Sequence, residues 1–216
     1  MMRHTIERYW HEIADLANGM PAGTISLVAE TLLDCHQRGG SIYFIGNGGS
    51  AATASHWVCD LAKGVRGGQQ RSFRAISLTD NMPLVTAWGN DTSYERVFAE
   101  QLAPLARPGD LVVLISASGN SPNVLLAAQT ARVARARTIG LTGRTGGRLR
   151  KLVDLNVRVP SDVIEQVEDV HVIIAHSVCV ALRARLESEA FLRETGDPLD
   201  IGLNRVFEEA TTEAGS

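Results

Sequence analysis

A short apolar run, a glycine-rich turn and a helical stretch follow one another between residues 41 and 56 and constrain the fold more than any other part of the sequence. Residues 41–45, Ser-Ile-Tyr-Phe-Ile, are typical of a buried strand. Glycine fills three of the next four positions, and Ser50 is expected to cap the alanine-rich helix that follows. Because glycines admit close approach and a helix N-terminus favours negative charge, this corner predicts an anion site.

A second corner of the same kind lies at residues 110–122. Residues 110–115 form another apolar run that predicts a buried strand. Ser116, Ser118 and Ser121 follow, and Pro122 then opens a helix, where its missing N–H costs nothing. Two corners that offer hydroxyls and free amides favour a phosphoryl group as the ligand.

Strands and helices alternate along the rest of the chain, which predicts an α/β fold: a three-layer αβα sandwich around a five-stranded parallel sheet. The predicted strands cover residues 41–45, 73–78, 110–115, 138–143 and 155–160. The fifth is more polar and is placed near an edge. Residues 88–93 are interpreted as a loop rich in side-chain acceptors. Ligands of such sheets bind beyond the carboxyl ends of the strands, where both corners would lie.

Helical segments flank this core. Two amphipathic helices are predicted within residues 4–38, and one long helix within 162–189. The chain is therefore expected to form a single domain over residues 1–190, with the helical segment (about 1–38) at its start. The polar, acidic tail 191–216 is expected to be partly disordered.

Composition excludes several classes of partner. A formal net charge of −3 leaves no basic surplus for nucleic acid. No apolar run reaches the roughly 18 residues of a membrane span, and the N-terminus lacks a secretory signal pattern. The three cysteines have no metal-type or disulfide spacing, which predicts reduced thiols in a cytoplasmic protein.

Two carboxylate–imidazole pairs lie at helical spacing. His56 and Asp60 are four residues apart, and Glu168 and His176 are eight apart, so each pair shares one helix face. Together they suit either an acid/base site or a four-ligand metal site, although such pairs are more often surface ion pairs. Periodicity does not rank them above two competing residues of the second helix, Asp169 and His171.

Several motifs, in this order, resemble the sugar-isomerase (SIS) domain family, specifically its phosphoheptose isomerase branch. The resemblance covers roughly residues 1–187. It is carried by Gly46-Asn47-Gly48-Gly49-Ser50 with His56, by residues 116–124, by residues 141–147, and by Glu168-Asp169-Val170-His171 with His176.

The resemblance implies a flavodoxin-like αβα core, assembled as a homotetramer with active sites at the subunit interfaces. Family enzymes interconvert sedoheptulose 7-phosphate and a heptose 7-phosphate in heptose biosynthesis, by enediol acid/base chemistry, and some of them carry zinc. A cytoplasmic isomerase with a sugar-phosphate substrate and a zinc cofactor is therefore expected.

The resemblance also implies roles for individual residues. Phosphate would be held by Ser50, Ser116, Ser118 and Ser121. The rest of the substrate would meet Asn47, Gly48, Asp91 and Glu168. Asp60 would be the catalytic base and His176 its acid/base partner. The zinc ligands would be His56, Asp60, Glu168 and His176.

Three positions differ from the family pattern. Asp60 replaces a glutamate, so its carboxylate should stop about 1–1.5 Å short unless the helix shifts. Glu168 replaces a glutamine, which adds negative charge and improves the set for a divalent metal. Ala117 replaces a threonine and removes one hydroxyl from the serine corner.

Two functions of different classes follow from these residues. The first is the isomerase, because paired acid/base groups such as His56 and His176 have no use in a binding protein. The second is a non-catalytic phosphosugar-binding or regulatory SIS protein of the replication-initiator-associating type, which the shortened Asp60 favours. A dinucleotide-binding protein is disfavoured, because residues 46–49 lack the required glycine spacing.

Overall fold

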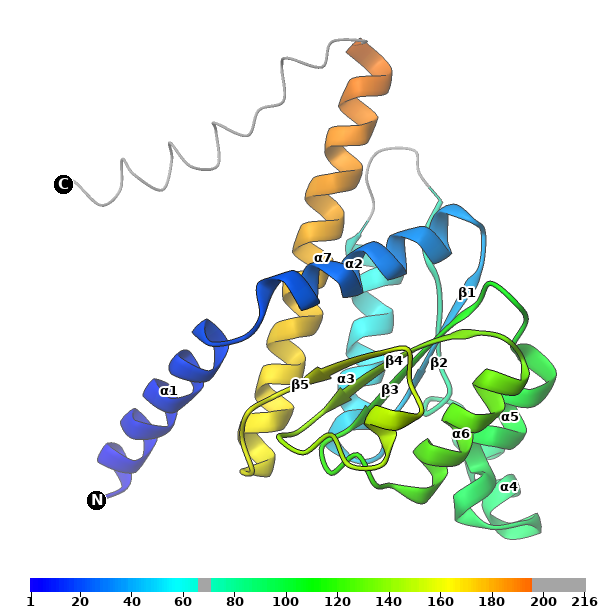
Figure 1. Cartoon of the computed structure of the whole chain (residues 1–216), viewed down its shortest axis with the longest axis horizontal. Coiled ribbons are helices and arrows are strands. Elements are labelled where there is room, and N and C mark those ends of the chain that lie inside the picture. The colour runs from blue at the N-terminus through cyan, green and yellow to red at the C-terminus, as the bar shows by residue number, and fades with distance from the viewer. Residues whose placement is uncertain (66–70, 196–216) are drawn as a thin grey trace.

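The computed structural model describes residues 1–65 and 71–195 (Figure 1). Its elements, in chain order, are α1 (Met2–Asn18), α2 (Ala22–Gln37), β1 (Ser41–Ile45), α3 (Gly49–Cys59), η1 (Asp60–Gly64), β2 (Arg74–Ser77), α4 (Met82–Asp91), η2 (Tyr94–Arg96), α5 (Val97–Leu105), β3 (Leu111–Ser116), α6 (Pro122–Val133), β4 (Arg137–Thr142), η3 (Leu149–Lys151), β5 (Leu155–Arg158) and α7 (Ile164–Thr195). η1 is a π-helical turn, whereas η2 and η3 are 3₁₀ turns.

The five strands form one parallel sheet in the order β2-β1-β3-β4-β5. Every residue of β1 and β3 is buried, as expected for central strands covered on both faces. β5 is an edge strand with partly exposed residues, which confirms the prediction for it. The chain runs from β1 to β2 on one side and then to β3 on the other, so the carboxyl ends of β1 and β3 flank the switch point.

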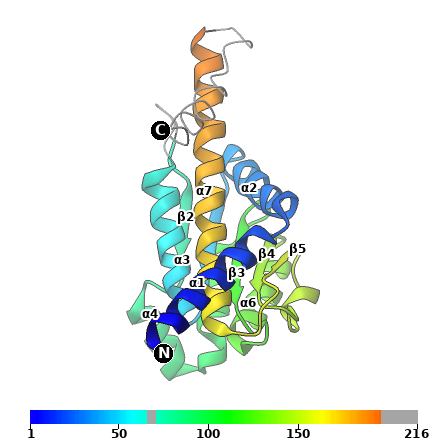
Figure 2. The same cartoon turned by 90° about the vertical axis from the view of Figure 1, so that its left-hand side faces the viewer.

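Helices cover both faces of the sheet, which confirms the three-layer prediction (Figures 1 and 2). On one face, Leu32 of α2, Trp57 of α3 and Val170 of α7 belong to a single apolar core. On the other face, Phe98 of α5 and Leu125 of α6 belong to a second core. α3 and α7 therefore pack beside each other over the same strands, which brings residues about 120 positions apart in the chain together.

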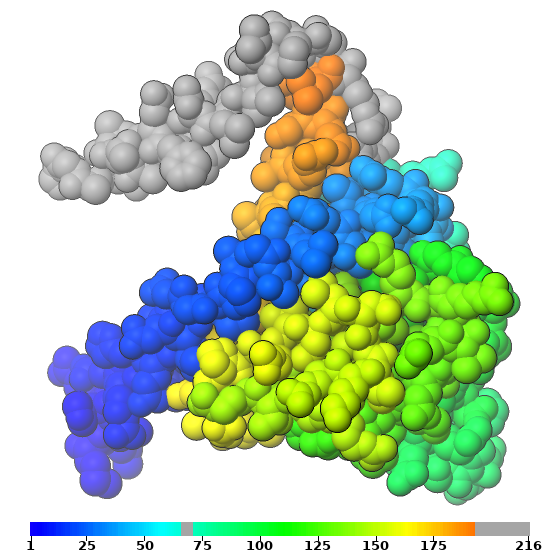
Figure 3. Space-filling view, viewed as in Figure 1, coloured from blue at the N-terminus to red at the C-terminus, as the bar shows by residue number. Residues whose placement is uncertain are grey.

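The first helix lies at the periphery of the molecule. α1, dark blue at the lower left of Figure 3, has no buried residue. Ile6 and Trp10 of this helix are 50% and 67% exposed. It contacts α7 through Tyr9, whose hydroxyl donates to Asp169 at 2.7 Å. The amide of Gln166 donates to Glu12 at 2.7 Å. In the described part of the chain, no helix is both long and apolar enough to cross a membrane.

Two local predictions were wrong. Trp88–Asp91, predicted as part of a loop, form the last turn of α4, because the Asn81 side chain accepts from Leu84 N and Pro83 suits the first turn. Ser50 does not cap α3. The cap is Gly48, whose φ of +54° glycine adopts readily, so the helix starts at Gly49, two residues earlier than a Ser50 cap would place it.

The end of the chain differs in part from the expectation. α7 continues to Thr195, so its helix includes residues 191–195, which the sequence placed in the tail. The rest of the predicted tail, residues 196–216, lies outside the described residues.

Candidate active site

The corner after β1 is shaped by close contact of the backbone with itself. A Cβ on Gly46 would lie 2.6 Å from the backbone carbon of Ser50, so a larger residue would push the first turn of α3 away. Ser50 is 5% exposed in that turn. The expected glycine turn is therefore present, with Gly48 and Ser50 at the start of α3.

The serine corner after β3 is stabilised by hydrogen bonds within it and by contact with the turn after β4. The hydroxyls of Ser116 and Ser121 lie 3.1 Å apart and share a hydrogen bond. Ser118 Oγ accepts from Asn120 N at 3.1 Å. The backbone of Gly119 lies directly on the turn after β4 and accepts from Leu149 N at 2.9 Å. Three hydroxyls thus gather at one strand end, which suits a phosphoryl group.

A pair of asparagines joins the two corners. Asn47 Nδ2 donates to Asn123 Oδ1 and Asn123 Nδ2 donates to Asn47 Oδ1, both at 2.9 Å. The hydroxyl of Tyr94 also donates to Asn47 Oδ1, at 3.0 Å. Sequence reasoning did not single out Asn123 or Tyr94. Asn123 lies within residues 116–124, one of the segments that carry the family resemblance. No spacing rule links it to Asn47, which is 76 positions away.

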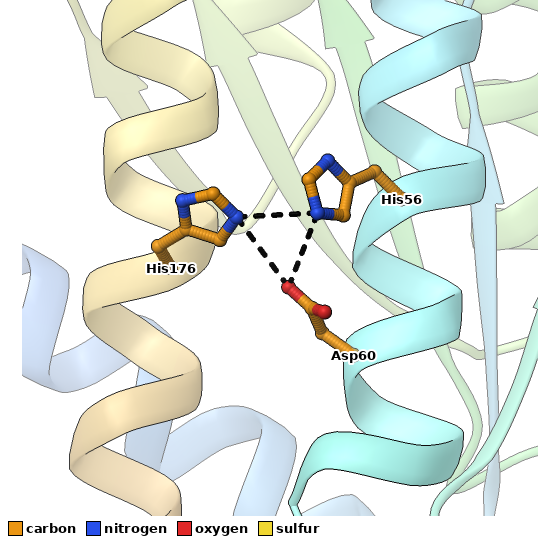
Figure 4. Close-up of side chains that lie close together, drawn as sticks. All are labelled: His56, Asp60 and His176. Atoms are coloured by element: carbon orange, nitrogen blue, oxygen red, sulfur yellow. Dashed lines mark hydrogen bonds and ion pairs between the residues drawn. The ribbon is translucent and has the colours of Figure 1, made fainter.

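His56, Asp60 and His176 meet between α3 and α7 (Figure 4). The two Nε2 atoms lie 3.2 Å apart, and Asp60 Oδ2 lies 3.7 Å from His56 Nε2 and 3.6 Å from His176 Nε2. The imidazoles are about half exposed and the Asp60 side chain is 29% exposed, so reactants can reach them. Asp60 opens the wider π-helical turn η1, and its shorter side chain still reaches both histidines.

These three residues fit a divalent metal. Ligand atoms on a tetrahedron with metal–ligand distances of about 2.1 Å are about 3.4 Å apart. The separations of 3.2, 3.6 and 3.7 Å come close to that value. Two imidazoles that face each other through Nε2, with a carboxylate oxygen beside them, form a typical donor set for zinc.

Glu168 does not join this group; its carboxylate lies against Gly49 in the first turn of α3. A Cβ on Gly49 would lie 2.5 Å from the Glu168 carboxyl carbon, so only glycine leaves room for it. The positive end of the α3 dipole stabilises a carboxylate at this point. Three of the four expected metal ligands therefore meet within one protomer.

The two competing residues of α7 have other partners. Asp169 accepts from the Tyr9 hydroxyl, and His171 is 1% exposed with Nε2 lying 3.4 Å from the Thr142 carbonyl oxygen. Asp91, expected to face the sugar, lies at the exposed end of α4 and accepts from Asn90 Nδ2 at 2.9 Å. The structure thus ranks His176 above its neighbours, whereas periodicity did not.

His171 predicts a pH dependence of stability. Burial lowers its pKa from 6.5 to about 4, against a smaller opposing effect of the Thr142 carbonyl. Between pH 6.5 and pH 4, His171 is protonated in the unfolded chain but stays neutral in the folded chain. The free energy of unfolding therefore falls as the pH drops through this range. The loss between pH 7 and pH 4 should be about 3 kcal/mol. Urea unfolding of the wild type and His171→Leu checks this: the variant should lose that part of the slope, and equal slopes would contradict the assignment.

Comparison with known proteins adds independent evidence. The SIS domain family model matches residues 8–143. A phosphoheptose isomerase of Geotalea daltonii is 43% identical over 165 residues, which cover 76% of this chain and 85% of the relative. Phosphoheptose isomerase 1 of Campylobacter jejuni is 37% identical over 180 residues, covering 82% and 96%.

Solved structures of phosphoheptose isomerases also match most of this chain. A phosphoheptose isomerase from Francisella tularensis has a TM-score of 0.79 at 30% identity and covers 85% of this chain and 98% of its own. The corresponding enzyme from Neisseria gonorrhoeae has a TM-score of 0.78 at 30% identity, covering 84% and 98%. The sugar isomerase domain of an RpiR transcription factor from Sphaerobacter thermophilus shares the fold, with a TM-score of 0.61 at 14% identity.

Proposed function

Because the chain belongs to the SIS domain family, and relatives that it matches over most of their length are phosphoheptose isomerases, we infer that it interconverts sedoheptulose 7-phosphate and a heptose 7-phosphate. The observation that carries this inference is the meeting of His56, Asp60 and His176 between α7 and α3, the helix that begins at the glycine corner. A protein that only bound a phosphosugar would have no need of paired acid/base groups, so the regulatory alternative is not favoured.

The residues can be assigned to the steps of an aldose–ketose isomerisation. One base moves a proton between C1 and C2, and a second group moves a proton between the two oxygens. We assign the first task to the Asp60 carboxylate and the second to His176 Nε2, since these atoms lie 3.6 Å apart and can face one enediol. Both side chains come from helices packed on the core, so their spacing is held before substrate binds.

The phosphate is placed at the serine corner in this proposal. Ser116, Ser118 and Ser121 offer hydroxyls there. Glu168 brings a negative charge to the first turn of α3, so the phosphate is better placed away from that turn. Ser50, which the family pattern assigns to the phosphate, would then face the carbohydrate end, together with Gly48, Asn47 and Asp91.

Zinc is part of the proposal. His56, Asp60 and His176 would hold the ion, with Glu168 as a fourth donor if its side chain swings from Gly49. When bound, a divalent ion polarises the substrate carbonyl.

Removal of a ligand should weaken zinc binding. We expect one zinc per chain, and Asp60→Ala should lower its affinity at least tenfold, as measured by competition with a chromophoric chelator. Glu187→Ala, an exposed carboxylate further along α7, is the matched control. Glu168→Ala tests whether Glu168 is a fourth ligand. We expect it to lower the zinc affinity less than Asp60→Ala does. If the purified wild type contains no zinc and its activity does not change with chelator, the metal proposal is wrong and the acid/base assignment still stands.

A homotetramer with interface active sites, and a cytoplasmic location, complete the proposal. The exposed Ile6 and Trp10 on α1 support an assembly, because water would otherwise cover this apolar face. Light scattering on a sizing column measures the molar mass and so the number of chains in the assembly. If α1 forms an interface, Trp10→Glu should lower that number.

The direct test of function is an assay with sedoheptulose 7-phosphate, with product detected by chromatography, in the presence of zinc and then of chelator. Conversion to a heptose 7-phosphate is the expected result. If the wild type binds the sugar phosphate but converts none of it in either condition, the regulatory reading replaces the isomerase.

A further inference from the structure

The orientation of the Asn47 amide is set by its partners. Asn123 donates to its oxygen and accepts from its nitrogen, each at 2.9 Å. Asn123 Oδ1 also accepts from Val124 N at 3.0 Å. That backbone N–H can only donate, so it fixes which end of the Asn123 amide is the acceptor and, through the reciprocal pair, which end of Asn47 is the donor.

Burial makes this arrangement rigid. Asn123 is 2% exposed in the first turn of α6, and a buried amide without partners costs about 1–3 kcal/mol. Rotation of either amide by 180° would break both hydrogen bonds of the pair at once. Tyr94, whose side chain comes from η2, adds a third hydrogen bond, to Asn47 Oδ1 at 3.0 Å, although its own surface is 60% exposed.

The pair also spans the switch point of the sheet. Asn47 follows β1 and leads into α3, which carries His56 and Asp60, whereas Asn123 belongs to the helix that follows the serine corner. Their hydrogen bonds therefore tie the acid/base side of the site to the phosphate side. Within the described residues, one N–H of the Asn47 amide is left without a partner and is available to a substrate hydroxyl.

We propose that Asn123 and Tyr94 are positioning residues: they hold the Asn47 amide toward the sugar and fix the spacing between the serine corner and the acid/base cluster. The expected effects on kcat rest on the proposed isomerase function. The fixed orientation of the Asn47 amide does not depend on that function. A displacement of about 1 Å between bound groups can cost about a hundredfold in rate, so the loss of this tie should appear in kcat.

The test compares Asn123→Ala and Tyr94→Phe with a matched control, Thr130→Val, which removes a hydrogen bond of 3.0 Å to Leu126 O on the same helix. Asn123→Ala should lower kcat at least tenfold, and Tyr94→Phe about two- to tenfold, while Thr130→Val keeps the wild-type value. Inhibition by inorganic phosphate should stay within about twofold of the wild-type constant in all variants, because the serine hydroxyls remain. The exposed Tyr94 keeps the test valid if Asn123→Ala does not fold.

The double variant examines whether both residues act through Asn47. In Tyr94→Phe/Asn123→Ala the loss should not exceed that of Asn123→Ala by more than about twofold, since the amide is already released. Fully multiplied losses would show that Tyr94 acts elsewhere and would overturn its part of the proposal. Equal kcat values in Asn123→Ala and Thr130→Val, or a parallel loss of kcat and phosphate inhibition, would overturn the rest.

A second readout separates this inference from the proposed function. In asparagine-labelled protein, the Asn47 side-chain amide proton that is bonded to Asn123 Oδ1 should exchange slowly with solvent in the wild type and in Thr130→Val, and fast in Asn123→Ala. If the wild type converts no sugar phosphate, the isomerase proposal fails while slow exchange still supports the held amide. Fast exchange in the wild type overturns the held amide even in an active enzyme.

Discussion

Replacing His176 by alanine is expected to lower kcat by a factor of about 10²–10⁴ while the protein stays folded. The side chain is 50% exposed, so its removal leaves no buried cavity. Its Nε2 lies 3.6 Å from Asp60 Oδ2 and 3.2 Å from His56 Nε2, beside the carboxylate that we propose as the base. Steady-state kinetics with sedoheptulose 7-phosphate measure the effect.

Ser177→Ala is the matched control for this variant. Ser177 is the next residue of α7, is exposed, and bonds only its own helix at Ile173 O among the described contacts. Its loss should change kcat less than twofold and leave the melting temperature close to that of the wild type. A His176→Ala enzyme that keeps more than a tenth of the wild-type kcat would remove His176 from the proton transfers.

Gly119→Ala should destabilise the fold by more than about 3 kcal/mol. Gly119 has a φ of +64°, and a Cβ there would lie 2.6 Å from the carbonyl carbon of Gly146 and 2.9 Å from Gly147 N. All of these contacts are with backbone, which cannot swing aside as a side chain can. The serine corner would have to separate from the turn after β4, so kcat/KM should fall as well.

Gly39→Ala separates the clash from the backbone cost. Gly39 has a similar φ of +75°, but nothing lies within 4 Å of the added methyl group. It should lose only about 1 kcal/mol, the usual cost of a left-handed alanine. Urea unfolding at one protein concentration compares the two, and Tm should drop about 2–4 °C per kcal/mol. Equal losses would mean that the contact with residues 146 and 147 carries no energy.

The local parts of the site were predictable because they depend on short stretches of chain. The strand 41–45, the serine corner and the spacing of His56 and Asp60 each need only neighbouring residues. Errors arose where a local signal had a competitor. Acceptor-rich residues 88–91 were interpreted as a loop, but the Asn81 cap extends α4 through them. Ser50 suited a cap, but the left-handed Gly48 started the helix first.

Taken alone, the sequence determined the fold class and the parallel sheet with its two polar corners, since these follow from periodicity and glycine turns. The candidate site residues came from the order of the motifs, through the family resemblance. Only the tertiary structure decided that His176 rather than Asp169 or His171 meets His56, and that Glu168 lies against Gly49. It alone revealed the pair of Asn47 and Asn123. The physical reason is that such contacts join residues far apart in the chain, and the packing of α3, α6 and α7 on one sheet sets distances that no local pattern contains.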